Sequence, residues 1–199
     1  MNCEYCANEA IYRCSLCGKT VCAEHLKLRP VCPACTKQAE TAYTISRVTS
    51  ASERNAIRRC VKQFWGEEEQ LSFDRKFDVI GLPAYVAKGR NQVIGFISFA
   101  EADDTIIIVA LGVQPKYQGS GVGTSLITEV EAEAKRQGTS KLLVSTSNDD
   151  LPALAFYQRL GFQIYEVKPN VIAEKHGKIL EGIGELPIRD ELRLQKILR

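Results

Sequence analysis

The stretch Val113-Gln114-Pro115-Lys116-Tyr117-Gln118-Gly119-Ser120-Gly121-Val122-Gly123 decides the fold, because it joins a long apolar run to an amphipathic segment. The run before it, residues 105–113, is almost continuously apolar and predicts a strand buried on both faces. After it, apolar residues recur at helical spacing up to Gly138, at Leu126, Ile127, Val130 and Ala134. The sequence therefore predicts a strand, a glycine loop and a helix in succession.

The glycine loop predicts an anion site. Gly119, Gly121 and Gly123 let the backbone turn sharply and approach a ligand closely. The helix that follows offers unpaired N–H groups and a positive dipole end, which together suit a pyrophosphate. The Gly-x-Gly-x-Gly spacing fits neither a Walker P-loop nor a dinucleotide fingerprint. On these six residues alone, a glycine-rich turn without a ligand stays open as an alternative.

The surrounding sequence predicts an α/β domain with a mixed sheet over residues 43–199. A helix begins near Ser50 or Ser52, and its apolar face includes Cys60, which we expect to be a buried small hydrophobe. Residues 66–77 show no clear period and predict a loop or a poorly formed helix. A third helix follows 148–150 and stops at Gly161. Strands are expected at 43–48, 84–88, 93–100, 141–147, 163–167 and 192–198.

Seven of the eight cysteines lie in the first 35 residues and form four pairs of possible metal ligands with His25. Two ligands three positions apart can reach one tetrahedral zinc, and eight ligands fill two closed, structural sites. A zinc module over residues 1–38, too poor in apolar residues to fold without metal, is therefore predicted. A disulfide framework, or one zinc with loose thiols, are the alternatives. The ligands are Cys3, Cys6, Cys14, Cys17, Cys22, His25, Cys32 and Cys35.

The loop and its context resemble the GNAT superfamily of N-acetyltransferases. The acetyl-CoA signature Gln/Arg-x-x-Gly-x-Gly/Ala is met by Gln118, Gly121 and Gly123, and Asn148 and residues 155–162 match further downstream. The resemblance covers residues 43–199. It implies a GNAT-like mixed sheet flanked by helices, with acetyl-CoA as co-substrate.

The resemblance also implies roles for individual residues. The backbone of Leu111, Gly112 and Val113 would pair with the pantetheine arm, and Asn148 would contact the cofactor near it. Tyr157 would sit beside the thioester sulfur and protonate the departing thiolate. The pyrophosphate would be held by the N–H groups of Gln118, Gly119, Ser120, Gly121, Val122, Gly123 and Thr124.

The chemistry is consistent with these roles. A tyrosine with a pKa of about 10 is a competent acid toward a thiolate, and a backbone N–H, expected at Val113, can polarise the thioester carbonyl. The strand before the loop carries no carboxylate, so the general base is not assigned. Glu101, Asp103 and Asp104 could act through water, or could simply form a turn. An α-amine acceptor, with a pKa of about 8, would need no base.

The N-terminal spacing resembles the B-box and related cross-brace zinc fingers. That resemblance implies one zinc on Cys3, Cys6, Cys22 and His25. It implies a second zinc on Cys14, Cys17, Cys32 and Cys35. The usual B-box ends in two histidines, whereas this motif ends in Cys32 and Cys35, so the pairing order stays open.

Composition narrows the function classes. With 26 Lys or Arg against 24 Asp or Glu, the net charge of +2 argues against a strongly basic nucleic-acid binder. Residues 1–40 balance five basic against four acidic side chains, so nucleic-acid binding by the zinc module is not expected. No apolar run predicts a membrane helix and no leader is seen, so we expect a cytoplasmic protein.

The predicted function is an N-acetyltransferase that moves an acetyl group from acetyl-CoA to a primary amine. The acceptor could be a protein N-terminus, a lysine or a small amine, and the zinc module would recruit a partner or the substrate. The alternative is a non-catalytic acyl-CoA-sensing protein whose zinc finger binds protein or nucleic acid.

Overall fold

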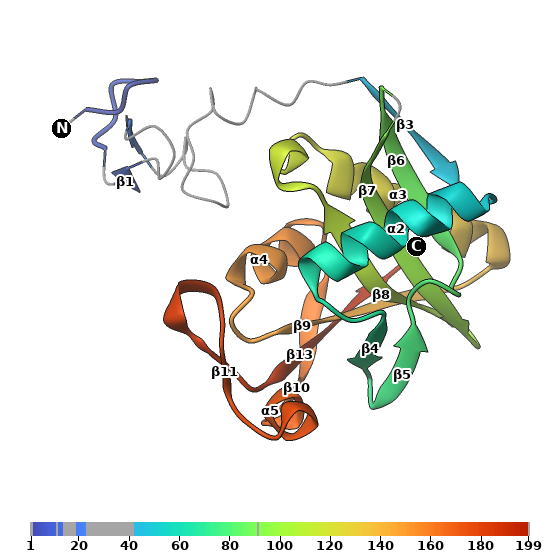
Figure 1. Ribbon diagram of the computed structural model, residues 1–199. Helices are drawn as coiled ribbons and strands as arrows, with labels where there is room; N and C mark the ends of the chain where they lie inside the picture. Colours follow the sequence, from blue (N-terminus) through green and yellow to red (C-terminus); the bar gives the residue numbers. More distant parts are fainter. Residues whose placement is uncertain (1, 11, 14–18, 23–41, 91, 199) are drawn as a thin grey trace.

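The computed structural model describes residues 2–10, 12–13, 19–22, 42–90 and 92–198. Its main body is a seven-stranded sheet with the order β10-β13-β9-β8-β7-β6-β3 (Figure 1). Only β8 and β9 run parallel, so the predicted α/β fold with a mixed sheet is confirmed. The strands are β3 (Tyr43–Arg47), β6 (Ala84–Gly89), β7 (Gln92–Ala102), β8 (Thr105–Val113), β9 (Lys141–Ser147), β10 (Gln163–Lys168) and β13 (Glu191–Ile197).

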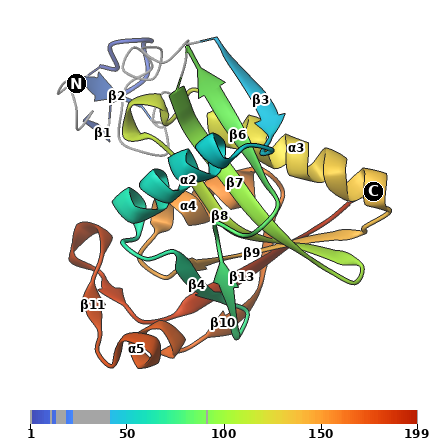
Figure 2. The ribbon, with the colours of Figure 1, turned by 45° about the vertical axis from the view of Figure 1, so that its right-hand side comes forward.

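Helices cover both faces of this sheet. The helix α2 (Ala51–Phe64) packs on one face and α3 (Val122–Gln137) on the other, as Figure 2 shows. The α3 face buries Leu126, Ile127 and Val130, and it also includes part of α4 (Leu151–Arg159). The α2 face buries Cys60, as predicted, and Val61. Each such apolar side chain contributes about 1.5–3 kcal/mol by leaving water.

The helix α2 begins with a complete capping box. The Ser50 side chain accepts the N–H of Glu53 at 3.2 Å, and the Glu53 carboxylate accepts the N–H groups of Thr49 and Ser50, both at 3.0 Å. The carboxylate also pairs with Lys88. Lys88 first, and then these N–H groups, lower the pKa of Glu53 to about 2. Of the two caps that the sequence offered, the structure uses Ser50.

The prediction for residues 66–77 was wrong, because this segment forms a hairpin of β4 (Glu69–Ser72) and β5 (Arg75–Asp78). Phe73 and Asp74 at its turn have positive φ angles of 53° and 58°, as a two-residue hairpin turn requires. Phe77 packs on the sheet against Ala100 and Ile107. The hairpin is anchored by Phe77, by the partly buried Phe73 and by polar contacts, so the segment lacks the alternating pattern of a strand.

The sequence also did not predict the excursion between β10 and β13, residues 169–190. It contains α5 (Val171–His176), β11 (Leu180–Glu181), a 3-10 turn (Ile183–Glu185) and β12 (Pro187–Ile188). In Figure 1 it lies at the same end of the sheet as the β4–β5 hairpin. These two segments form the walls of the site described below.

In the N-terminal part, β1 (Tyr12–Arg13) pairs antiparallel with β2 (Thr20–Val21). Asn2 and Glu9 form an additional isolated bridge. Across the described ranges, no helix is both long and apolar enough to cross a membrane.

Candidate active site

The sheet splits between β8 and β9. Their pairing covers only Thr105–Ile108 against Lys141–Val144. Beyond it, β8 stays with β7 as far as Val113, and β9 stays with β13 as far as Ser147. An extra residue in β8, Val109, forms a bulge at the point of separation. The second half of β8 therefore has an open backbone edge.

The register shows which backbone groups face that opening. Gln114 donates its N–H to the Ile94 carbonyl at 2.9 Å, and Val113 lies opposite Gly95. Hydrogen-bonded pairs alternate in an antiparallel ladder, so the backbone groups of Leu111 and Val113 point away from β7. The predicted pairing with an extended ligand can therefore come from these two residues.

Gly112 differs from Leu111 and Val113 in the direction of its backbone groups. It lies opposite Phe96 in the register, and a Cβ here would come within 2.7 Å of both the Phe64 and the Phe96 rings. By the same alternation, its backbone groups are directed toward β7. Gly112 thus lets two aromatic rings pack against the strand, and its predicted contact with the pantetheine arm stays a prediction.

The glycine loop leaves the start of α3 open. Gly119 and Gly121 have φ angles of 83° and 88°, which favour glycine, and Gly121 at the helix start has no side-chain cap. Within the described chain, none of the N–H groups from Gly121 to Thr124 has a hydrogen-bond acceptor. The first turn contains no acidic residue. The loop therefore presents several converging donors at the positive end of a helix dipole.

Two side chains fix the loop on the end of β8. Gln118 donates from Nε2 to the Val113 carbonyl at 2.9 Å, and Ser120 donates from Oγ to the Tyr117 carbonyl at 2.5 Å. A Cβ at Gly123 would lie 3.2 Å from the Phe156 ring, so this glycine lets α3 approach α4. Gln118 and Ser120 thus hold the loop with their side chains. Their N–H groups donate to the Pro115 and Tyr117 carbonyls at 3.3 and 3.4 Å, so their predicted contacts with a pyrophosphate stay predictions.

A cavity of about 420 Å³ opens in the split of the sheet. Its floor is formed by residues 108–111 of β8 and 144–147 of β9, and its walls by the β4–β5 hairpin and the 169–190 excursion. Of the predicted site residues, Leu111 and Tyr157 line it. Gly112, Val113, Asn148 and residues 118–124 are not part of its lining.

Tyr157 is placed by α4 and is 6% exposed. The Asp150 side chain caps this helix by accepting the Ala153 N–H at 3.0 Å. Phe156 and Phe162 contact the Tyr157 ring edge-on. Burial, and then the charge of Asp150, raise the pKa of the Tyr157 phenol well above its usual value. The phenol is therefore protonated at neutral pH and can donate a proton into the cavity.

Asn148 fastens the excursion. Its Nδ2 donates to the Pro187 carbonyl at 2.7 Å, and its Oδ1 accepts the N–H groups of Arg189 and Asp190 at 3.0 and 2.9 Å. Next to it, Asp149 accepts the Ile183 N–H at 3.0 Å. The amide of Asn148 is thus used within the protein, and its predicted contact with a cofactor stays a prediction.

The opposite wall is fastened by Arg193, a residue that the sequence did not single out. Its guanidinium pairs with Glu191 at 2.8 Å, Glu166 at 3.0 Å and the hairpin residue Asp74 at 2.9 Å. Glu191 also accepts the Phe73 N–H at 3.0 Å. Burial opposes the charge of Arg193, but these carboxylates raise its pKa above its usual value. The hairpin is therefore held on the sheet by ionised groups.

The three carboxylates considered as water-mediated bases do not line the cavity. Asp104 accepts the Ser140 N–H at 2.8 Å, and Glu101 accepts from Gln137 at 2.8 Å. Asp103, with a φ of 47°, occupies the β7–β8 turn. They lie at the far end of β8 from Leu111, which favours a turn-forming role.

A larger cavity, of about 940 Å³, lies between α2, the start of β3 and the β6–β7 turn. Polar and charged side chains dominate its lining, including Arg59, Lys88 and Arg90. None of the predicted site residues lines it. We therefore place the candidate site in the smaller cavity, which lies at the split between β8 and β9 and is lined by Tyr157.

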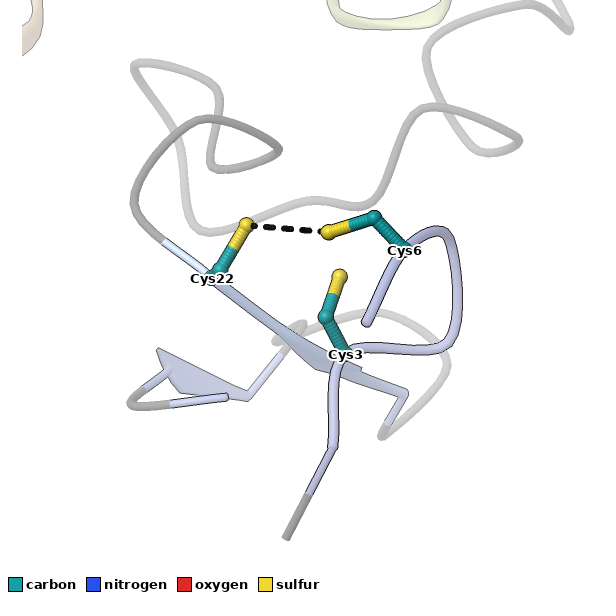
Figure 3. A group of neighbouring side chains, drawn as sticks. All are labelled: Cys3, Cys6 and Cys22. Carbon is teal, nitrogen blue, oxygen red and sulfur yellow. Dashed lines mark hydrogen bonds between the residues drawn. The ribbon is translucent and has the colours of Figure 1, made fainter. Parts of the chain in front are cut away.

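Three cysteines converge in the N-terminal part, as Figure 3 shows. The sulfurs of Cys3, Cys6 and Cys22 all lie within 4.8 Å of one another, and Cys6 and Cys22 are 3.7 Å apart. Two sulfurs on one tetrahedral zinc lie about 3.8 Å apart, given a Zn–S bond of about 2.3 Å. Tyr5 donates its N–H to Cys3 Sγ at 3.5 Å, which favours the thiolate. This donor set fits a zinc ion.

The three residues belong to the first and third ligand pairs of the motif, which a cross-brace would join on one ion. The other five predicted ligands lie outside the described residues: Cys14, Cys17, His25, Cys32 and Cys35.

Comparisons with known proteins identify the family. The model of the acetyltransferase (GNAT) family matches residues 52–162. This is more than half of the chain, and the protein therefore belongs to the acetyltransferase (GNAT) family.

Individual relatives extend the match. The uncharacterized protein YxbD of Bacillus subtilis is 27% identical over 144 residues, which are 69% of this chain and 89% of the relative. The solved structure of an IAA acetyltransferase from Bacillus cereus superposes with a TM-score of 0.66 at 26% identity, covering 79% of this chain and 100% of that one. A GNAT acetyltransferase from Elizabethkingia anophelis, solved with acetyl-CoA bound, shares the fold, with a TM-score of 0.59 at 21% identity over 78% of this chain and 98% of that one.

Proposed function

We propose that this protein transfers an acetyl group from acetyl-CoA to a primary amine. The observation that carries the proposal is the open edge of β8 beside the cavity that Tyr157 lines. The uncapped start of α3 follows shortly after on the same chain. Acetyl-CoA, bound in a structure of the same fold, has the features that these elements would hold. It combines an extended amide arm with a pyrophosphate.

The chain would bind this co-substrate mainly through backbone groups. Leu111 and Val113 would pair with the pantetheine amides as a further strand would. The N–H groups from Gly121 to Thr124, which have no acceptor in the described chain, would hold the pyrophosphate. The Val113 N–H, directed into the split, would polarise the thioester carbonyl.

Tyr157 would act as the general acid. The amine nitrogen attacks the thioester carbonyl, the N–C bond forms and the C–S bond breaks. The departing thiolate takes the phenolic proton, the amine releases its own proton to solvent, and the Tyr157 phenolate regains a proton from solvent. Tyr157 lines the cavity, which would place its phenol within reach of the departing sulfur.

Thiol release from acetyl-CoA tests the proposal directly. We expect the full chain to release thiol with one class within a panel of polyamines, aminoglycosides and peptides with free or blocked N-termini. Tyr157→Phe should lower kcat about 100-fold or more and leave the acetyl-CoA Kd unchanged, because only the proton is lost. Binding of acetyl-CoA without turnover on any acceptor would instead support the non-catalytic sensor.

We also propose that the N-terminal module holds two structural zinc ions and recruits a partner or the substrate. The convergence of Cys3, Cys6 and Cys22 supports the first of these sites. Metal analysis of the purified chain should give two zinc ions per molecule. Replacing Cys6 by Ser should lower that number and leave acetyl-CoA binding intact, since a closed site takes no part in chemistry. A zinc-free protein with an unchanged fold would contradict the proposal.

A further inference from the structure

One ion pair joins the two walls of the cavity. Glu67, just before β4, and Lys175, on α5, bring Oε1 and Nζ to 2.6 Å although they are 108 residues apart in sequence. Both residues line the cavity. The pair therefore bridges the hairpin side and the excursion side of the same space.

The pair stands at the entrance. The Glu67 side chain is 47% exposed and that of Lys175 is 24% exposed, whereas Tyr157 at the inner end is 6% exposed. Ser72, Ser145 and Ser147 add hydroxyl groups to the same lining. Glu67 and Lys175 are therefore the solvent-facing part of the lining, and Tyr157 belongs to its buried part.

The dimensions favour a small acceptor. Each wall is fastened separately, one by Arg193 and Glu191 and the other by Asn148 and Asp149. The volume of about 420 Å³ is that of a small-molecule site. A folded protein surface would have to displace both walls, whereas a small amine would displace only one exposed ion pair.

The charges favour a cationic acceptor. Four carboxylates line the cavity, those of Glu67, Asp74, Asp150 and Glu191, whereas the basic side chains of that lining are those of Lys175 and His176. Arg193 behind the wall adds a second positive charge. Lys175 itself shows that Glu67 binds an ammonium group in this position.

The reaction adds a further condition. The nitrogen that attacks the thioester must be neutral, so it cannot be the ammonium group that a carboxylate holds. We infer that the acceptor is a small diamine or polyamine whose second ammonium group binds Glu67 in place of Lys175. The inference rests on the proposed acetyl transfer. It makes Glu67 a specificity-determining residue and Lys175 an internal competitor of the substrate.

Two substitutions should act in opposite directions. In the full chain at saturating acetyl-CoA, Lys175→Met should lower the KM values for putrescine and spermidine about two- to fivefold, the range of an exposed ion pair. Glu67→Gln should raise both KM values by about fivefold or more, because it removes the binding carboxylate. Neither variant should change the KM for butylamine, which has no second ammonium group.

Matched controls are available close by. Lys178→Met changes an exposed lysine of the same excursion that does not line the cavity, and Glu69→Gln changes a carboxylate that pairs with Lys76 outside it. Both should leave every KM unchanged.

The inference is overturned if Lys175→Met raises the diamine KM, because the Glu67–Lys175 pair would then hold the cavity walls in position and would not compete with the substrate. It is also overturned if the wild-type chain acetylates peptides but no diamine, in which case the proposed acetyl transfer still stands. Absence of thiol release with every acceptor would overturn both proposals.

Discussion

The first turns of α2 and α3 differ in how their backbone N–H groups are satisfied. Each helix begins with N–H groups that lack partners within the helix. At the start of α2, the side chains of Ser50 and Glu53 each accept the other residue's backbone N–H, and Lys88 pairs with the Glu53 carboxylate. At the start of α3, Gly121 provides no side chain, and the N–H groups up to Thr124 have no acceptor in the described chain.

The difference separates a structural helix start from a binding one. At the α2 terminus the N–H groups of Ser50 and Glu53 have acceptors, those of Ala51 and Ser52 have none in the described chain, and an added anion would meet the Glu53 carboxylate. At the start of α3, the N–H groups have no acceptor in the described chain, and the loop glycines place no side chain over them. Under the proposed function, that space would hold the pyrophosphate of acetyl-CoA.

Converting the α3 start into a capped one should have the largest effect. Gly121→Asp places a carboxylate where the pyrophosphate would bind, at a backbone φ of 88° that Asp tolerates better than most residues. Like-charge repulsion and the lost donors should weaken acetyl-CoA binding about 100-fold or more, as measured by isothermal titration calorimetry.

The same helix offers the control. Gly138 ends α3 with a φ of 71° and has open space where a Cβ would be. Gly138→Asp introduces comparable backbone strain and the same charge at the other end. Its acetyl-CoA Kd should stay at the wild-type value, and a loss equal to that of Gly121→Asp would mean that charge or strain alone is responsible.

Removing the cap of α2 should affect stability alone. Ser50→Ala deletes the acceptor of the Glu53 N–H and should lower the free energy of unfolding by about 1 kcal/mol. Denaturant titration measures this change. The acetyl-CoA Kd should not move, and a weaker Kd in this variant would contradict the separation of the two helix starts.

A further effect should appear at acid pH. The folded pKa of Glu53 is about 2, below the value of about 4.3 expected in the unfolded chain. Its contribution is therefore fully present above the unfolded pKa and is lost as pH falls toward the folded one. Between about pH 4.5 and 2, the wild-type chain should lose stability more steeply than Glu53→Gln. Parallel stability curves for the two proteins would count against this assignment.

The sequence predicted those features whose determinants are local. The long apolar run of β8, the glycines of the loop and the periodic apolar face of α3 are adjacent in the chain, and each limits the conformation of its own segment. The Ser50–Glu53 box is likewise contained in four residues. Cys60 was correctly placed in the core because it lies on the apolar face of α2.

The walls of the cavity could not be predicted in this way. The β4–β5 hairpin depends on Arg193 and Glu191, whose partners Phe73 and Asp74 are more than a hundred residues away. In sequence, Glu191 and Arg193 look like the solvent face of an alternating strand, yet each is only 5% exposed. Asn148 matched a family position, but its amide hydrogen-bonds Pro187 and Arg189, about forty residues further along the chain, which the sequence pattern does not predict.

Amide chemical-shift mapping with acetyl-CoA tests the central claim most directly. In ¹H–¹⁵N spectra of the full chain, addition of acetyl-CoA should shift the amides of Gly121, Val122, Gly123 and Thr124 strongly. The amides of Ser52, Glu53 and Arg54 in the first turn of α2 should stay in place. Saturable binding that leaves the α3 amides unmoved, or that shifts both helix starts alike, would contradict the assignment of the open helix start as the binding site.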